Sequence, residues 1–432
     1  MGQIRSFMRI TPEDNVPPAV SALFKHNFFV NLIDNAIWMV GDSFSSVATI
    51  LPVFLPTLTD SPLLIGLIPA IINGGWVLPQ LLMANRASRA KSIFKFARKY
   101  AVLERTPYLF FPILALLIGR ISTTWALLIF FLLITWRGIA AGMVALPWQM
   151  VIGEVIPLSH RSRFFGIARL FGQILGVLAA GAAALVLDRI VYPKNYALLF
   201  LFTLIAFWLC YVFFAMNRDP KADQRSQADH TPDPAQQHTL ASYAAILKQD
   251  KNFRNYIISR IFYYLGIMAT GFLAVYGIQK FSLSDSQAAV FSGLLLASGV
   301  IGYAVWGFLG DRIGPKRIVM VSIGMWIGAL LAAVFAASAW VYYMVFVLYG
   351  LASAGFILGD LVLVMELGSE EQMAAYMGLA RTLPGIFLLL SPILAGWVAG
   401  QTSYPFMFGL SIAFSLLFFV SMWGVRDRPR RG

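Results

Sequence analysis

Two carboxylates lie within one long apolar stretch near the start of the chain. Asp34 and Asp42 belong to residues 27–56, where polar or amphipathic side chains such as Asn31 and Trp38 recur at steps of three and four. This spacing places them on one face of a helix. Since a carboxylate on such a face can take up and release a proton, we interpret the four residues as one wall of a proton- or solute-binding cavity. The alternative is that they only pack against neighbouring helices, with Asp42 in an ion pair.

Three charged residues in later apolar stretches could complete such a site. Arg137 is followed by a run of small residues, and we expect it to be the partner of Asp34. Arg260 and Asp360 form a second set, with Tyr264 close to Arg260 in the sequence. This set is either a charge pair that stabilises the helices or an anion site with an aromatic wall, and both interpretations stay open.

The composition indicates a membrane protein. Hydrophobic residues make up 59% of the chain and charged residues 12%, and the mean hydropathy is +0.73. A water-soluble domain with this composition would expose far more apolar surface than water tolerates. The net charge of +13 does not indicate nucleic-acid binding, because the basic residues gather in alternate loops and at the ends of the chain. That asymmetry is typical of a membrane protein with its basic loops in the cytoplasm.

Twelve stretches are long enough to cross the hydrocarbon core, which requires about 20 residues each. Because twelve is even, both termini lie on one side, and the basic tail and the basic loop at residues 86–99 place that side in the cytoplasm. The third stretch is short and follows a basic run, Lys91–Arg105, that has the pattern of an amphipathic surface helix. The stretches are residues 27–56, 62–84, 106–120, 124–152, 164–187, 196–216, 255–281, 286–309, 317–337, 340–365, 373–399 and 404–424.

The chain divides into two halves that repeat each other. Residues 217–254 form one long polar stretch with six apolar stretches on either side. The spacing of Glu154, Gly166 and Arg169 recurs in the second half at Glu366, Gly378 and Arg381. We predict a cytoplasmic segment at residues 1–26, a first six-helix bundle at 27–216, a linker with an amphipathic helix at 217–254, a second bundle at 255–424 and a basic tail at 425–432.

The segment Gly307–Arg317 is a tight, charged turn between two apolar stretches. It matches the pattern Gly-x-x-x-Asp-Arg-x-Gly-x-Lys/Arg at nearly every position. The chain therefore resembles the major facilitator superfamily, which implies an all-α membrane fold of twelve helices in two pseudo-symmetric six-helix bundles. The first half departs from the pattern, because Asn85 stands where the second half has Asp311. The resemblance thus implies a gating role for the acidic residue in the second half only.

The resemblance also implies a gate of charged residues at the cytoplasmic ends of the helices. The spacing of Glu154 and Arg161 is similar to a salt-bridge motif of sugar porters. We expect the gate to break and re-form as the bundles move, and the alternative is a set of static surface pairs. Its expected members are Arg86, Glu154, Arg161, Arg169, Gly307, Asp311, Arg312, Lys316, Glu366 and Arg381.

The sequence carries no phosphate-binding loop, metal-ligand spacing or nucleophile arrangement. We therefore expect no enzyme, no ATP site, no metal and no cofactor. The predicted function is secondary active transport of a small organic, amphipathic solute by alternating access, coupled to the proton gradient. The expected partners are this solute and the lipid bilayer, with no nucleic acid, and the protein is expected to act as a monomer in a bacterial inner membrane. The alternatives are a lipid or lysolipid flippase of the same fold and a membrane sensor that transports nothing.

Overall fold

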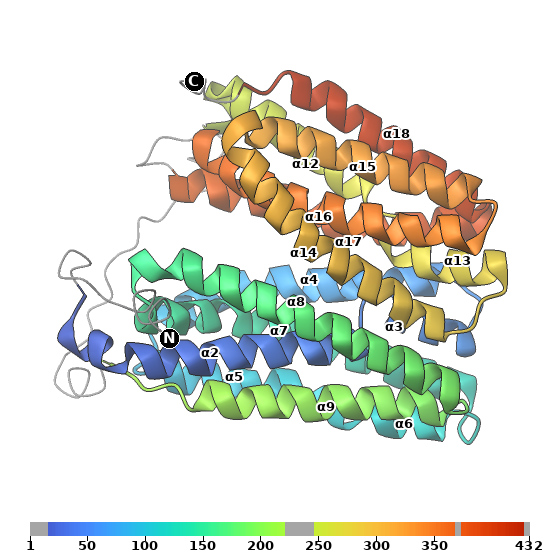
Figure 1. The fold of residues 1–432 in the computed structure, drawn as a ribbon, viewed down its shortest axis with the longest axis horizontal. Helices are drawn as coiled ribbons and strands as arrows, with labels where there is room; N and C mark the ends of the chain where they lie inside the picture. The colour runs from blue at the N-terminus through green and yellow to red at the C-terminus, as the bar shows by residue number, and fades with distance from the viewer. Residues whose placement is uncertain (1–15, 221–245, 368–372, 427–432) are drawn as a thin grey trace.

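The computed structural model describes residues 16–220, 246–367 and 373–426. The described residues form long, roughly antiparallel helices in two bundles, one from each half of the chain, and no strand (Figure 1). The first bundle contains α2 (Pro18–Phe44), α3 (Ile50–Phe54), α4 (Pro62–Ser88), α5 (Ile93–Arg105), α6 (Phe111–Leu117), α7 (Thr123–Val155), α8 (Leu158–Arg189) and α9 (Lys194–Ala215). The second contains α12 (Lys251–Gly266), α13 (Leu273–Phe281), α14 (Ser286–Ile313), α15 (Pro315–Phe335), α16 (Ala339–Leu367), α17 (Met373–Gln401) and α18 (Tyr404–Trp423). The predicted all-α fold class is confirmed.

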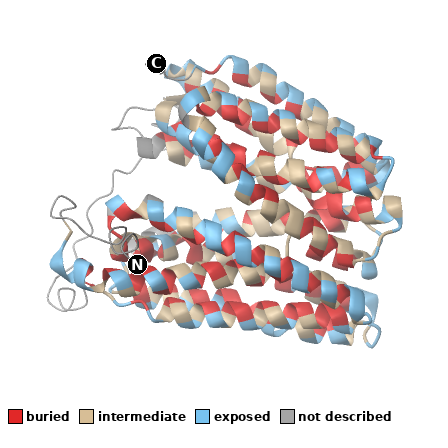
Figure 2. Cartoon of the chain, in the orientation of Figure 1, coloured by how far each residue is buried: buried red, intermediate tan, exposed pale blue. Residues whose placement is uncertain are grey.

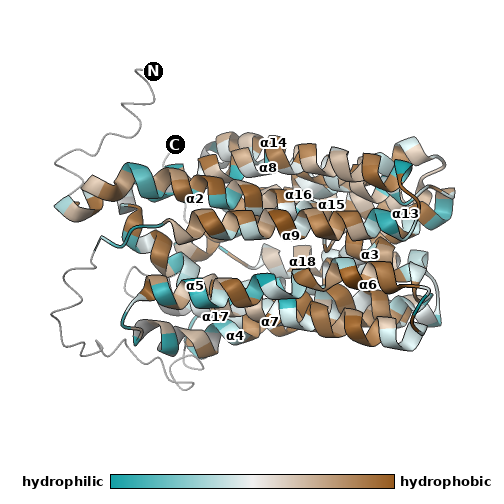
Figure 3. Ribbon diagram, turned by 90° about the horizontal axis from the view of Figure 1, so that it is seen from below, coloured by the Kyte–Doolittle hydropathy of each residue, from teal (hydrophilic) through white to brown (hydrophobic). Residues whose placement is uncertain are grey.

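Eleven helical segments of the described chain are long and apolar enough to cross a membrane. Helix α2 is not among them, because polar side chains interrupt its apolar sequence, yet its 27 residues span about 40 Å and it packs along α8 and α9. Large apolar side chains cover the outer surface, including Leu132, Leu178 and Val420, which are 63%, 65% and 71% exposed. Exposed segments run along the outside of both bundles (Figure 2), and hydrophobic residues predominate along the middle of the helices (Figure 3). The chain is a multi-pass membrane protein.

The basic run at Lys91–Arg105 is not a surface helix, and this expectation was wrong. It forms α5, which packs against α7 and α9 and continues through the short 3₁₀ helix η3 (Thr106–Leu109) into α6. Together they make one span, Ile93–Leu117. Its apolar face is buried in the bundle, whereas Lys95 and Lys99 are exposed near the start of the helix, where long side chains can reach polar surroundings.

The two bundles share a hydrogen-bond pattern that confirms the internal repeat. The side chain of Asn27 accepts a hydrogen bond from the backbone N–H of Arg218 at 2.9 Å and donates one to its carbonyl at 2.9 Å. The side chain of Asn252 makes the same two bonds with Arg426, at 2.6 and 2.8 Å. In each bundle an asparagine of the first helix therefore fixes the backbone that follows the last helix.

The predicted tight turn after Gly307 is confirmed in its backbone. Helix α14 ends at Ile313, Gly314 has φ 85° and ψ 156°, and Pro315 begins α15. Only glycine adopts this left-handed conformation without strain, and proline suits the first position of a helix. One residue therefore separates two antiparallel helices.

The two ends of the bundles differ in how closely they approach. We call the end with the start of α2 and the end of α18 the termini side, and the end with the loops at residues 45–61 and 282–285 the far side. The bundles meet toward the far side and diverge toward the termini side (Figure 1). The contact helices are α4 with α17 and α8 with α14, each pair joining one bundle to the other.

Candidate functional site

The first helix of each bundle is interrupted near the far side. Helix α2 ends at Phe44 and the chain resumes as α3 at Ile50, and α12 ends at Gly266 before α13 begins at Leu273. Discontinuous helices of this kind form binding sites in many transporters, because their free backbone groups face a cavity. Asp42 precedes the first interruption and Tyr264 precedes the second, so the structure places predicted site residues at both.

Arg137 pairs with Asp42 and not with Asp34, so the expected partner was wrong. Its Nη2 donates to Asp42 Oδ1 at 3.1 Å, and its guanidinium carbon lies 5.6 Å from the centre of the Tyr108 ring. The Arg137 side chain is 8% exposed, whereas that of Asp42 is 34% exposed. The pair thus joins a buried cation to a carboxylate that solvent or a solute can reach.

Asp34 lies two helical turns from Asp42 in a different environment. Eight residues at 1.5 Å each separate the two by about 12 Å along α2. Asp34 is 4% exposed and accepts a hydrogen bond from Trp148 Nε1 at 3.3 Å. The guanidinium of Arg105 and the thiol of Cys210 are its other polar neighbours. The cation that interacts electrostatically with Asp34 therefore comes from α5.

Glu104 and Arg105 belong to this site and were not predicted. Arg105 Nη1 donates to Glu104 Oε2 at 2.8 Å, and the two residues are 5% and 8% exposed respectively. Arg105 also donates to the carbonyls of Phe207 and Ala101 at 2.9 Å each, and to Cys210 Sγ at 3.1 Å. The signal in the sequence was an adjacent acid and base directly before an apolar stretch. It was missed because the basic run was interpreted as a surface helix.

Asn31 and Trp38 pack inside the first bundle. Asn31 and Asn217 exchange side-chain hydrogen bonds of 2.6 and 3.0 Å, and Asn31 is fully buried. The Trp38 ring stacks on Phe207 with 5.8 Å between centroids. These two members of the predicted polar stripe of α2 therefore contact α9 or the segment that follows it.

Arg260 and Asp360 form the charge pair that was one of their two predicted roles. Arg260 Nη1 donates to Asp360 Oδ2 at 2.5 Å, and Tyr256 donates to Asp360 Oδ1 at 2.7 Å. Arg260 Nη2 donates to the Tyr264 hydroxyl at 2.7 Å, and the guanidinium lies 5.0 Å from the centre of that ring. Tyr263 stacks on Phe356 beside it, so an aromatic wall is present as well.

A small cavity of about 60 Å³ lies next to this group in the second bundle. Its polar lining consists of hydroxyl groups and an indole, without a charged side chain. The residues that line it are Tyr263, Ile267, Thr270, Ser322, Ile323, Trp326, Tyr349, Ala352, Ser353 and Phe356.

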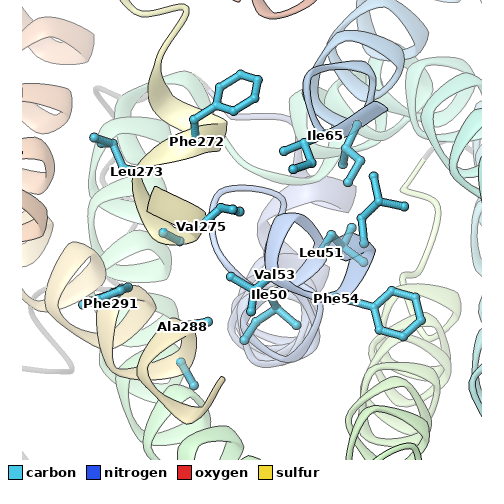
Figure 4. Packing of buried hydrophobic residues seen from close by; sticks show 14 of the residues in the cluster. Ile50, Leu51, Val53, Phe54, Ile65, Phe272, Leu273, Val275, Ala288 and Phe291 are labelled. Carbon is cyan, nitrogen blue, oxygen red and sulfur yellow. The ribbon is translucent and has the colours of Figure 1, made fainter. Parts of the chain in front are cut away.

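The far side is closed by contacts between the bundles. Apolar residues of α3 pack with residues of α13 and α14, including Ile50, Val53, Val275 and Ala288 (Figure 4). Two hydrogen bonds cross the same region. Tyr196 donates to Asp285 Oδ2 at 2.9 Å, and the hydroxyls of Thr49 and Ser292 pair with each other.

The close contacts between α8 and α14 lie toward the far side and do not extend to the termini side. A Cβ on Gly293 would lie 3.6 Å from Ala180, and one on Gly176 would lie 3.1 Å from Leu296. Farther toward the termini side, no described atom lies within 4 Å of a Cβ built on Gly166 or on Gly307. The same holds for Gly378 on α17, whereas Gly396 of that helix would meet the Pro62 carbonyl at 2.6 Å. The bundles are therefore closed at the far side and apart at the termini side.

The predicted gate residues lie at the termini side, and most of their known contacts stay within one bundle. Arg161 donates to the carbonyls of Ile156 and Gly153, and Lys316 donates to those of Trp423 and Val425. Arg312 lies over the Phe308 ring of its own helix. Arg86, Arg169 and Arg381 are exposed, Glu154 and Glu366 are half-buried near the ends of α7 and α16, and the side chain of Asp311 is outside the described part of the chain.

Arg169 is a predicted gate residue with a contact between the bundles. Its guanidinium lies 5.9 Å from the centre of the Tyr303 ring on α14. It also interacts electrostatically with Asp42. This arginine therefore links the α8–α14 contact to the Asp42–Arg137 pair.

Comparison with known proteins relates part of the chain to a transporter family. Residues 256–432 match the model of the Major Facilitator Superfamily. The uncharacterized MFS-type transporter YqjV of Bacillus subtilis (strain 168) is 26% identical over 160 residues, which are 35% of this chain and 37% of that protein.

Similar folds occur in solved transporter structures. A mutant of the nucleoside transporter NupG aligns with a TM-score of 0.71 and 16% identity over 94% of this chain and 100% of its own. The D-xylose-proton symporter aligns with a TM-score of 0.71 and 14% identity over 93% and 98%. A bacterial homologue of the iron transporter ferroportin, in an inward-facing state, gives 0.68 and 17% over 92% and 98%. The signature turn and the duplicated bundles agree with these matches: residues 256–432 match the Major Facilitator Superfamily, and the fold of the whole chain is similar to that of these solved transporters.

Proposed function

We propose that the protein is a proton-coupled secondary transporter for a small, amphipathic organic solute, with its termini side in a bacterial cytoplasm. The orientation follows from the basic residues, which concentrate in the loops and tail of the termini side. The proton gradient supplies the energy in this proposal, so it requires no nucleotide, metal, nucleic acid or second subunit.

Alternating access accounts for the asymmetric packing of the bundles. The α4–α17 and α8–α14 contacts, the apolar cluster around α3 and the Tyr196–Asp285 hydrogen bond close the far side. Open space next to Gly166, Gly307 and the start of α17 supports an opening at the termini side. In the proposed orientation this is a conformation open to the cytoplasm, and rocking of the bundles would exchange the open and closed sides.

The observation that carries the proton coupling is the Asp42–Arg137 pair. A charged group inside a membrane protein is costly, so its presence needs a functional or structural reason. Asp42 is one third exposed and next to the interruption of α2, and the arginine with which it forms an ion pair is buried. Protonation of Asp42 would weaken the pair, and release of the proton would restore it. A solute gradient and a proton gradient can be coupled through such an exchange.

The second bundle supplies the proposed contacts to the solute. Its cavity joins tyrosine and serine hydroxyls to the faces of Trp326 and Phe356, and its lining carries no charge. Such a lining suits a small molecule with apolar faces and a few hydrogen-bonding groups. The Arg260–Asp360 pair beside it would fix the position of Tyr264.

A transport assay in inverted membrane vesicles tests this function. The vesicle interior is acidified, and quenching of a pH-sensitive dye is followed while amphipathic cations, amphipathic anions, sugars and lysolipids are added in turn. We expect one class to release the quenching in wild-type vesicles and in the matched control Asp60→Asn, whose carboxyl group is in an exposed far-side loop. Asp42→Asn should abolish this signal at normal protein abundance.

Other outcomes of this assay contradict the proposal. An unchanged response in Asp42→Asn would exclude coupling through this carboxylate. Silence toward every soluble compound, together with movement of a fluorescent lipid between leaflets, would favour the flippase.

A further inference from the structure

Buried charges balance in the second bundle but not in the first. In the second bundle one guanidinium, Arg260, faces one carboxylate, Asp360. In the first bundle Asp34 and Glu104 both interact with Arg105. If both carboxylates were ionised, this group would carry a surplus negative charge. All three of its members are at most 8% exposed, so water does not screen that charge.

The partners of the two carboxylates are unequal. Glu104 receives a charge-assisted hydrogen bond from Arg105 at 2.8 Å. Asp34 receives its hydrogen bond from a neutral donor, the Trp148 indole, and the neutral Cys210 thiol lies beside it. An ionised carboxylate is strongly disfavoured inside a protein unless a counter-charge is close. One proton on the pair removes the surplus charge.

The unbalanced group connects to the Asp42–Arg137 pair. Glu104 interacts electrostatically with Arg137 as well as with Arg105, and the Tyr108 hydroxyl lies in the field of all of these charges. Electrostatic interactions thus connect Asp34 with Arg105, Arg105 with Glu104, Glu104 with Arg137, and Arg137 with Asp42, and we call these five residues the row. The charged and titratable groups that face the row are Asp34 and Asp42 from α2, Glu104 and Arg105 from α5, Tyr108 from η3, Arg137 from α7, Arg169 from α8, and Cys210 and Tyr211 from α9.

A second observation points to a ligand at one end of the row. Arg137 Nη1 and Ser45 Oγ are buried and make no hydrogen bond to a described residue. Both residues line a narrow recess that has no room for a water molecule in this conformation, and its other walls are Leu51, Tyr108, Phe111 and Phe200. A buried N–H and hydroxyl are costly to leave unsatisfied, so they mark a place that admits an acceptor such as water in some step of the cycle.

We propose that Asp34 and Glu104 hold one proton between them, with Arg105 as their shared cation, and that this buried pair stores the proton that Asp42 exchanges with solvent. This inference rests on the proton coupling proposed above. In the storage step the O–H bond on Asp42 breaks and an O–H bond forms on Glu104 or Asp34. One proton moves, and the total charge of the row does not change.

Infrared difference spectroscopy of the purified full-length protein in lipid vesicles tests the shared proton without any solute. Spectra are compared between neutral and alkaline pH, where a carboxylic acid and a carboxylate absorb at different frequencies. The wild type should show a carboxylic acid band at neutral pH. Carbon-13 labels placed separately in aspartate and in glutamate carboxyl groups should each shift part of this band.

Substitutions assign the band to the pair. Glu104→Gln and Asp34→Asn should each abolish it, because the remaining carboxylate then has Arg105 to itself. Asp360→Asn is the matched control, since it removes a carboxylate from the balanced pair and should leave the band in place. A wild-type spectrum without the band, a band that shifts with only one label, or a band that persists in both Glu104→Gln and Asp34→Asn would overturn the inference.

The two proposals fail in different ways. If the protein carries out proton-driven transport but shows no carboxylic acid band, the inference of a shared proton is wrong and the proposed function is still supported. The band in a protein without proton-driven transport would support the proton-holding pair and contradict the proposed function. The labelled wild type decides the first case even if a variant does not fold.

Discussion

At the scale of single residues, the two bundles handle their buried charges differently. The second bundle surrounds Arg260 with Asp360, Tyr256 and Tyr264, so one cation faces one anion and two hydroxyl groups. This group is electrically neutral when its carboxylate is ionised, so it requires no bound proton. The first bundle spreads its charges along α2, α5 and α7, and its carboxylate Asp42 remains partly exposed. The balanced charge pair of the second bundle suits a fixed structure, and the distributed charges of the first bundle suit an exchangeable proton.

Substitution of Asp360 tests the structural role of the charge pair in the second bundle. Asp360→Asn leaves Arg260 buried without a counter-ion, so it should lower the free energy of unfolding by about 3–5 kcal/mol. Tyr256→Phe removes one hydrogen bond and should cost about 1 kcal/mol. Thermal unfolding of the purified variants in one detergent measures the order of the two effects. Equal losses would show that the ion pair contributes little beyond the hydrogen bond.

The polar face of α2 was predictable, but its partners were not. Steps of three and four place Asp34 and Asp42 on one face whatever surrounds the helix. Which arginine meets which carboxylate depends on the height at which α5 and α7 cross α2, and local sequence spacing does not determine that height. Arg137 therefore reaches Asp42, and Arg105 takes the place next to Asp34.

At the scale of helices, periodicity predicted most spans and failed at α5. The basic residues of this helix lowered its hydropathy, although Phe94, Ala97 and Ala101 bury its apolar face in the bundle. The end of a span can carry lysines because their long side chains reach polar surroundings. The tight turn between α14 and α15 was predicted within the segment Gly307–Arg317, and the structure shows that Gly314, followed by proline, forms it alone.

An added Cβ should affect the closure of the far side at one glycine and not at another. A Cβ on Gly66 of α4 would overlap the backbone carbonyl of Pro392 on α17, a contact that exists when the far side is closed. Gly66→Ala should therefore disfavour this conformation by about 1–3 kcal/mol. A Cβ on Gly166 would meet no described atom in this conformation. Gly166→Ala should therefore leave the far side at least as closed as in the wild type.

Distances between spin labels measure this shift. Labels on cysteines introduced at the exposed far-side positions Thr57 and Ser284 report the separation of the bundles, and the native Cys210 is buried. We expect longer distances to gain population in Gly66→Ala and not in Gly166→Ala. The same change in both variants would mean that a general effect of alanine on the helices, and not the contact between α4 and α17, controls the conformation.

At the scale of the whole molecule, the duplicated bundles were visible in the sequence and the conformation was not. The repeated Asn27 and Asn252 make equivalent hydrogen bonds in their own bundles, so each repeat carries the signals for its own fold. Closure depends on contacts between the repeats, such as Tyr196 with Asp285, whose partners lie far apart along the chain. Since these contacts form and break as the bundles move, one sequence must accommodate both states, and its local patterns favour neither.

Asp285 makes far-side closure sensitive to pH. Burial raises the pKa of this carboxyl group above its usual value, and the hydrogen bond from Tyr196 lowers it in part. When the far side opens and Asp285 meets water, its pKa should return toward about 4. At pH values above the raised pKa the closed state pays for a desolvated carboxylate, and as the pH falls through that pKa protonation removes this penalty. Acid should therefore favour the closed far side.

The spin-label pair at Thr57 and Ser284 tests this linkage directly. In the wild type the population with short distances should rise as the pH is lowered. Asp285→Asn keeps an oxygen that accepts the hydrogen bond from Tyr196 but cannot ionise, so its short-distance population should be high and independent of pH in this range. Tyr196→Phe should reduce closure and retain the pH dependence, because Asp285 still loses water when the bundles meet. A pH dependence that persists in Asp285→Asn would place the responsible group elsewhere in the molecule.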